Sequence, residues 1–170
     1  MSILKSAFPI ILLDFEGFRD YNNQLFIKEL GIHDVTNNIT SCLTFQPPIY
    51  NSLRISNIQI QQTNKYIEQH IHGIPYNYGE LEYNQVYDIL SKYSSFNCIL
   101  ISKGNEKCEE LTTYCNKYVY DLNSFSETCC KTYKPSDHIS LCFNPHIKNN
   151  HCVLQKLCYY KALINHIKTH

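Results

Sequence analysis

The order of apolar segments along the chain most constrains the fold that this sequence can adopt. Three short segments with an apolar run or an alternating pattern come first, separated by residues typical of turns, and each predicts a β-strand. Because they follow one another closely, we expect an antiparallel meander. These segments are FPIILLDFEG (8–17), QLFIKELGIHDV (24–35) and TSCLTFQPP (40–48).

In the second half of the chain, the spacing of apolar residues alternates between the patterns of strands and of helices. FNCILISKG (96–104) and KYVYDL (117–122) have the length and composition of strands, and EKCEELTTYCN (106–116) between them has the pattern of a helix. A strand, a helix and a strand at these lengths predict two parallel strands joined by a crossover helix.

Three further segments are expected to be helical. QQTNKYIEQHI (61–71) is compatible with a helix, and Thr63 is a candidate N-cap. GELEYNQVYDILSKY (79–93) has apolar residues at helical spacing, and residues 151–170 close the chain with an apolar helical face. The whole order predicts an α/β fold with an RNase H-like mixed sheet: three antiparallel strands, then strand, helix and strand, and a closing helix.

Length and charge set the broad class. A chain of 170 residues fits one domain, which we expect to span residues 1–170. Lys plus Arg and Asp plus Glu both number 15, so no global field indicates a nucleic-acid or membrane partner. The apolar run near the N-terminus is too short to span a bilayer, and nine cysteines without a secretory signal favour reduced thiols. We therefore expect a cytoplasmic or nuclear protein with no membrane partner.

The segment ILLDFEGF carries the first candidate site. Residues two apart on a strand face the same side, so Asp14 and Glu16 would present two carboxylates together. Hard oxygen ligands of this kind suit Mg²⁺ or Mn²⁺, and two such ions about 4 Å apart can drive phosphodiester cleavage. The alternative is a polar strand end without a metal.

Four stretches in order make the chain resemble the DEDDh family of 3′–5′ exonucleases over nearly its whole length. LLDFEG resembles the family's Asp-x-Glu motif, FIKELGI its second strand, and HCVLQK its third motif. IHGIPYNYGELEYNQVYDIL resembles the segment before the helix over which a single-stranded 3′ end runs. The resemblance implies nucleic-acid-binding roles for four residues of that segment: His72, Gly73, Ile74 and Tyr76.

The same resemblance implies catalytic roles, with two departures. Asp14, Glu16 and His151 match the first carboxylates and the general base. The family's second-motif Asp has no direct counterpart, and Glu106 is the nearest acid, with Glu109 as a second choice. Lys156 stands where the last metal-binding Asp belongs, and a cation there would repel a second divalent ion.

A Cys/His cluster, CFNPHIKNNHC (142–152), precedes the last helix. Structural zinc takes four Cys, His or carboxylate ligands, and ordinary thiols are the alternative explanation. The cluster is similar to that of the Maelstrom domain, a DEDDh relative in a piRNA-pathway protein that has lost most catalytic acids and carries a Glu-Cys-His-Cys zinc set. The resemblance implies structural zinc, with His151 as an alternative to the His ligand, on four residues: Glu29, Cys142, His146 and Cys152.

Three functions follow from these patterns. The first is a Maelstrom-type nucleic-acid-binding domain, with single-stranded RNA or DNA and transposon-silencing or small-RNA proteins as partners, a structural Zn²⁺ and a degenerate nuclease site. The second is an active 3′–5′ exonuclease or RNase that uses Mg²⁺ or Mn²⁺. The third is an RNase H-like domain that serves protein contacts alone.

Overall fold

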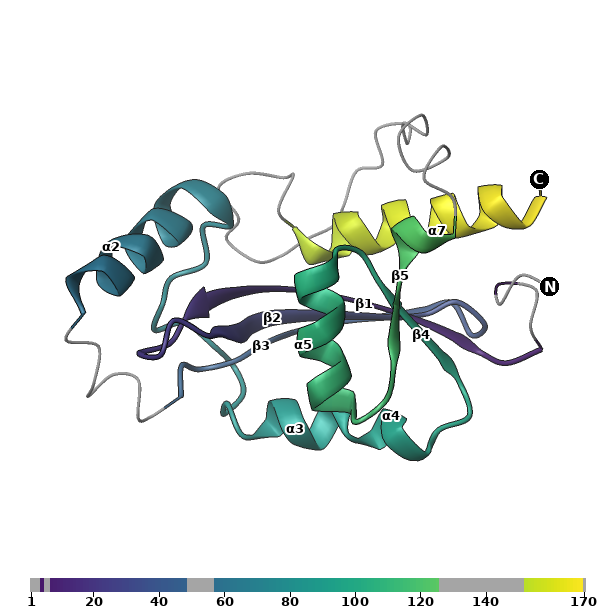
Figure 1. The fold of residues 1–170 in the computed structure, drawn as a ribbon, viewed down its shortest axis with the longest axis horizontal. Helices are drawn as coiled ribbons and strands as arrows, with labels where there is room; N and C mark the ends of the chain where they lie inside the picture. Colours follow the sequence, from purple (N-terminus) through teal and green to yellow (C-terminus); the bar gives the residue numbers. More distant parts are fainter. Residues whose placement is uncertain (1–3, 5–6, 49–56, 126–151, 170) are drawn as a thin grey trace.

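The computed structural model describes residue 4 and residues 7–48, 57–125 and 152–169. In this part of the chain a five-stranded sheet with the order β3-β2-β1-β4-β5 carries helices on both faces. Strands and helices alternate in the second half of the chain, and the last helix closes the fold (Figure 1). The strands are β1 (Ile10–Arg19), β2 (Leu25–Asp34), β3 (Ile39–Thr44), β4 (Ile99–Ser102) and β5 (Val119–Asp121). The helices that matter below are α2 (Ile58–Tyr66), α3 (Gln85–Leu90), α4 (Lys92–Ser95), α5 (Asn105–Cys115) and α7 (Val153–Thr169).

The expected meander is confirmed. Strand β1 pairs antiparallel with β2, and β2 pairs antiparallel with β3. The register of β1 and β2 shifts between Glu16 and Gly17, which places a bulge opposite the end of β1. At Gly17 the neighbouring backbone comes so close that a Cβ would lie 2.2 Å from the carbonyl oxygen of Phe26. Only glycine fits this crossing of the two strands.

The predicted crossover is also confirmed. Strand β4 pairs parallel with β1 and with β5, and α5 connects β4 to β5. Helix α5 follows Gly104, whose φ of 99° favours glycine, and ends at Asn116 in the left-handed region. The sheet is therefore mixed, as the order of the segments predicts.

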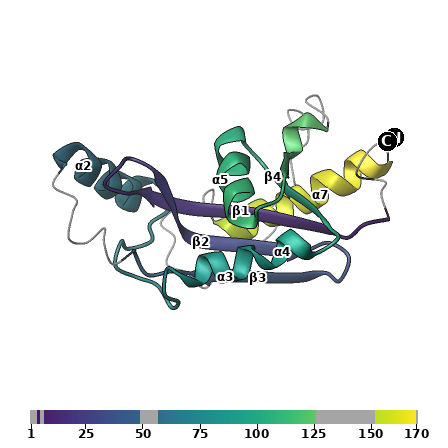
Figure 2. The ribbon, with the colours of Figure 1, turned by 60° about the horizontal axis from the view of Figure 1, so that its bottom comes forward.

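Strand alternation divides the core into two layers. One face of β1 sends Leu13 and Phe15 into a cluster with residues of α3 and α5, and the other face sends Leu12 into a cluster with α7. Helices α3 and α4 thus cover one face of the sheet and α7 the other, and the turned view brings α3 and α4 to the front (Figure 2). Asp14 and Glu16 have the parity of Leu12, so they face α7.

The prediction for the first helix was wrong in its start. The N-cap is Asn57, whose side chain accepts a hydrogen bond from the Gln59 N–H, and Thr63 lies inside α2. The helix then continues as a π-helical turn, Ile67–Ile71. Asn64 explains the position of α2: its amide accepts from the Arg19 N–H and donates to the Arg19 carbonyl, both at 2.8 Å. This pairing ties α2 to the end of β1.

Two other helices have different bounds from those expected. The segment 79–93 was expected to be one helix, but it holds α3 and only the start of α4, which begins at Lys92 after Ser91. Helix α7 covers most of residues 151–170, as the pattern predicts. No helix in the described ranges has both the length and the apolar character needed to cross a membrane.

Candidate functional site

The carboxylate pair, Asp14 and Glu16, lies on the α7 face of β1. Both side chains are buried, Asp14 completely. Ionised carboxylates are almost never placed in such surroundings unless cations or hydrogen-bond donors compensate them. The neighbouring cations therefore decide what this pair can do.

Two lysines from different helices meet the carboxylate pair. Lys107, near the start of α5, places its Nζ 2.6 Å from Asp14 Oδ1 and 3.8 Å from Glu16 Oε1. Lys156, in the second turn of α7, forms an ion pair with Glu16 Oε1 and lies 3.8 Å from Asp14 Oδ2. We call Lys107 and Lys156 the lysine pair. Each ammonium group is within ion-pair distance of both carboxylates.

Lys107 is held in place by more than charge. Its ammonium group also donates to the carbonyl of Phe15, between the two acids, and lies 5.2 Å from the centre of the Phe15 ring. Only about a fifth of the side chain of either lysine is exposed, 23% for Lys107 and 22% for Lys156. The lysine pair therefore forms the partly exposed side of a cluster whose carboxylates are buried and whose two positive and two negative charges balance.

The pKa shifts follow from burial and from the lysine pair. Burial raises the pKa of Asp14, and the attraction of Lys107 and Lys156 offsets it only in part. For Glu16 burial also opposes ionisation, but the two ammonium groups outweigh it, and the pKa of that carboxyl falls below its usual value. The pKa of Lys156 is raised because both carboxylates outweigh its desolvation.

The third predicted carboxylate has a different partner. Glu106 is largely exposed and accepts a hydrogen bond at 2.8 Å from the guanidinium of Arg19, at the end of β1. Glu109 accepts from the Asn105 amide at 3.3 Å. Among residues 4, 7–48, 57–125 and 152–169, no group of three or more His, Cys, Asp or Glu side chains is arranged to hold a metal ion.

The segment predicted to touch nucleic acid lies against the sheet. His72, Gly73 and Ile74 are buried, and Tyr76 is half-buried. The Ile74 N–H donates to Nδ1 of His72 at 3.0 Å, so Nδ1 is an acceptor and the ring proton lies on Nε2. Nε2 faces the Gly17 carbonyl at 3.4 Å. His72 thus fastens this segment to the end of β1, one residue beyond Glu16.

Two of the four predicted zinc ligands are described. Glu29, on β2, is buried, and the Cys42 thiol of β3 donates to its Oε1 at 3.4 Å. Cys152 is buried immediately before α7. Glu29 and Gly31 share one face of β2, and a Cβ at Gly31 would lie 3.2 Å from the Val153 Cβ, so the start of α7 lies over this face. Cys142, His146 and the predicted base His151 lie outside the described residues.

Sequence reasoning missed the roles of two lysines. It placed Lys107 with Lys103, Lys156 and Lys161 near the expected active face but did not predict its contact with Asp14. The signal for that contact is its position one residue after Glu106, in the first turn of α5. Lys28 is fully buried at the β-bulge, and its ammonium group donates to the carbonyls of Phe45 and Tyr76 at 2.7 Å and to that of Tyr78. A lysine that directly follows the apolar run LFI inside a predicted strand is the signal for such a buried cation.

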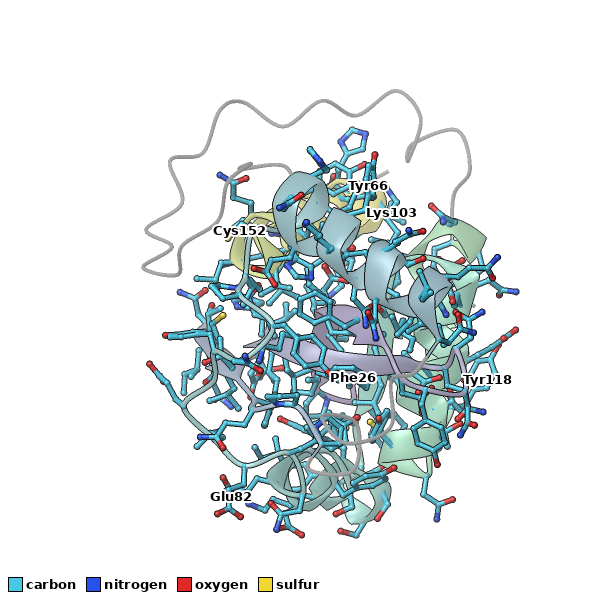
Figure 3. All side chains as sticks on the ribbon, turned by 90° about the vertical axis from the view of Figure 1, so that its left-hand side faces the viewer. Phe26, Tyr66, Glu82, Lys103, Tyr118 and Cys152 are labelled. Carbon is cyan, nitrogen blue, oxygen red and sulfur yellow. The ribbon has the colours of Figure 1, made fainter. Side chains whose placement is uncertain are left out.

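Figure 3 places the site relative to the two layers: Cys152 and Lys103 lie on the α7 side of the sheet, and Glu82 lies on the opposite side. Lys103 follows β4, and its Nζ lies 4.7 Å from the centre of the Tyr159 ring of α7. The cations Lys103, Lys107 and Lys156 therefore gather where the carboxyl end of β4 meets α7.

No protein-family model matches the chain, and no curated protein matches it. The class that the structure defines is an α/β domain with a five-stranded mixed sheet, whose central strand presents two buried carboxylates to two lysines.

Proposed function

We propose that this chain is a single-stranded-nucleic-acid-binding, RNase H-like domain of the Maelstrom type in which the nuclease site no longer hydrolyses. The observation that carries this proposal is the ion pairing of the buried carboxylate pair with Lys107 and Lys156. RNA is the proposed ligand, and silencing-pathway proteins are the proposed partners, because the resemblance to the Maelstrom domain implies them.

The fold supports the proposal. Three antiparallel strands followed by a parallel strand, a crossover helix and a second parallel strand follow the order expected for an RNase H-like sheet. Asp14 and Glu16 stand on its central strand, next to the parallel neighbour β4. This is the position that the resemblance implies for the first catalytic motif.

Mg²⁺ and Mn²⁺ do not fit the residues present. Two-metal hydrolysis needs carboxylates that are free to coordinate both ions. Here both carboxylates already face ammonium groups, and Glu106, the third acid that the sequence predicts for a nuclease site, is paired with Arg19. A divalent ion would have to displace a tethered cation and then lie beside it, which Coulomb repulsion opposes. We therefore derive no metal-dependent step for this site.

The ligand surface in this proposal is the cationic rim of the carboxylate cluster. Arg19, Lys103 and the lysine pair lie around it, and all four side chains are partly exposed. Phosphate chains are attracted in proportion to the number of such contacts, and the affinity falls with salt by a log–log slope of about 0.7 per phosphate contact for single strands. With a formal net charge of zero for the whole chain, binding would depend on this local group.

A structural Zn²⁺ is the second part of the proposal. Glu29 and Cys152 would supply two ligands, and Cys142 and His146 the others. The buried carboxylate of Glu29 beside the Cys42 thiol is the kind of oxygen and sulfur environment that zinc accepts, and the start of α7 lies over it. Zinc there would fasten β2 to the N-terminus of α7. Elemental analysis of the purified chain, against Cys152→Ser, tests this part.

The binding experiment uses fluorescence anisotropy with a 3′-labelled single-stranded RNA and the matching DNA. We expect saturable binding that is the same in EDTA and in Mg²⁺. The double variant R19E/K103E, at two rim residues, should weaken binding at least tenfold and lower the salt slope. The exposed Lys92 of α4, on the opposite face of the sheet, provides the matched control K92E, which should bind as the wild type does.

The cleavage experiment separates this proposal from the exonuclease. The same labelled strands are incubated with Mn²⁺ and analysed for shortened products, with D14N/E16Q as the control. We expect no products from either protein. Shortened products from the wild type and none from D14N/E16Q would show that the site is an active nuclease. In the binding experiment, an affinity that R19E/K103E does not change would exclude the cationic rim as the ligand surface.

A further inference from the structure

We infer that the ammonium groups of the lysine pair take the place of two divalent cations, so that the site around Asp14 and Glu16 is a permanently filled, metal-free counterpart of a metal centre. Removing the lysine pair should then uncover a site for a hard divalent cation. This inference concerns the same residues as the proposed function but does not rest on nucleic-acid binding.

The contacts of the lysine pair are bridging contacts. Lys107 Nζ lies 2.6 Å from one carboxylate and 3.8 Å from the other. Lys156 Nζ also contacts both carboxylates, but it lies closer to Glu16 and 3.8 Å from Asp14. An ordinary ion pair joins one cation to one anion. Here two cations share two carboxylates, as a pair of metal ions shares bridging ligands.

Lys107 also takes a backbone oxygen. Its ammonium group donates to the Phe15 carbonyl, between the two acidic residues of β1. Together with Asp14 Oδ1 and Glu16 Oε1, this gives the cation three oxygen neighbours from three consecutive residues. Carboxylate and carbonyl oxygens are the ligands that hard divalent cations choose, so the same oxygens can serve either kind of cation.

The two lysines belong to different helices. Lys107 is fixed by α5 and Lys156 by α7, and both helices pack on the sheet through buried apolar residues such as Leu111 and Leu157. Because each cation is tethered by the fold, its effective concentration at the carboxylates is high and does not depend on metal in the solution. The cluster is formally neutral, and a third cation gains little there.

The lysine pair also compensates the free-energy cost of burying the ionised carboxylate of Asp14. Asp14 is completely buried, and an ionised carboxylate without a counter-charge in that position would strongly favour the unfolded chain. In a metal centre the bound ion supplies this compensation, and removal of the ion weakens the fold. Here the chain itself supplies it, so chelators should have no effect on stability at this site.

The test measures Mn²⁺ binding by electron paramagnetic resonance of the free ion, with circular dichroism to establish folding. The variant K107A/K156D removes both ammonium groups and adds a carboxylate. Adding D14N/E16Q to it shows whether any new binding uses the carboxylate pair. K65D/K92A, which alters two exposed lysines of α2 and α4, is the matched control.

We expect the wild type and K65D/K92A to show no Mn²⁺ binding that D14N/E16Q removes. K107A/K156D should bind one Mn²⁺ at least tenfold more tightly than the wild type, and the gain should disappear when D14N/E16Q is added. Mn²⁺ should also raise the melting temperature of K107A/K156D and leave that of the wild type unchanged.

Two results would overturn the inference. One is Mn²⁺ binding by the wild type that D14N/E16Q abolishes, because the lysine pair would then not exclude a metal. The other is a folded K107A/K156D with no gain in Mn²⁺ affinity. If K107A/K156D does not fold without metal, refolding in Mn²⁺ decides: recovery of the native circular dichroism spectrum supports the inference, and failure in every concentration of Mn²⁺ contradicts it. None of these outcomes depends on whether RNA is bound.

Discussion

Replacing Lys107 with Met should destabilise the protein through the charge left on Asp14. The carboxylate is completely buried, and its two cationic neighbours lie 2.6 and 3.8 Å away. Because the Coulomb energy varies as 1/r, Lys107 supplies about three fifths of their combined attraction. Breaking a buried ion pair costs about 3–5 kcal/mol when one charge remains unpaired, so the part carried by Lys107 is about 2–3 kcal/mol.

A double-mutant cycle isolates this interaction. Chemical denaturation of the wild type, Lys107→Met, Asp14→Asn and the double variant gives four free energies of unfolding. We expect the double variant to lose about 1–2 kcal/mol less than the sum of the two single variants, because the interaction is then lost only once. Lys92→Met, at an exposed helical lysine, should change stability by less than about 0.5 kcal/mol. Additive losses, with a coupling below about 0.5 kcal/mol, would refute the reasoning.

Two further perturbations test the buried charges. The pKa of Glu16 lies below the ordinary 4.5, so its ionised carboxylate stabilises the fold above that pH, and this contribution disappears as the pH falls through the lowered value. In urea titrations below pH 4.5, Glu16→Gln should therefore lose stability with falling pH less steeply than the wild type. An equal dependence of stability on pH in the two proteins would contradict the lowered pKa. Lys28→Met should lower the free energy of unfolding by about 1–3 kcal/mol, since the three carbonyls that accept from Lys28 lose their common donor. Denaturation midpoints no different from those of Lys92→Met would argue against these contacts of Lys28.

The strands and their pairing followed from local sequence because apolar alternation and segment length are local properties. FPIILLDFEG and QLFIKELGIHDV predicted β1 and β2 within two residues at either end, and the strand–helix–strand segment predicted the parallel pair. The start of α2 did not follow. Thr63 and Asn57 are both residue types that cap helices, and only the pairing of Asn64 with the backbone of Arg19 explains where α2 lies.

The sequence by itself determined that Asp14 and Glu16 share one face of a strand, since side chains alternate with a period of two. It also located Lys156 at a position where a carboxylate was expected. Tertiary structure alone decided that Lys107 would reach the same carboxylates, because Lys107 and Asp14 are separated by 93 positions and meet through the packing of α5 on the sheet. The same docking decided that Glu106 pairs with Arg19. Charge partners of a buried group depend on helix packing, which is a property of the whole core and which no local pattern encodes.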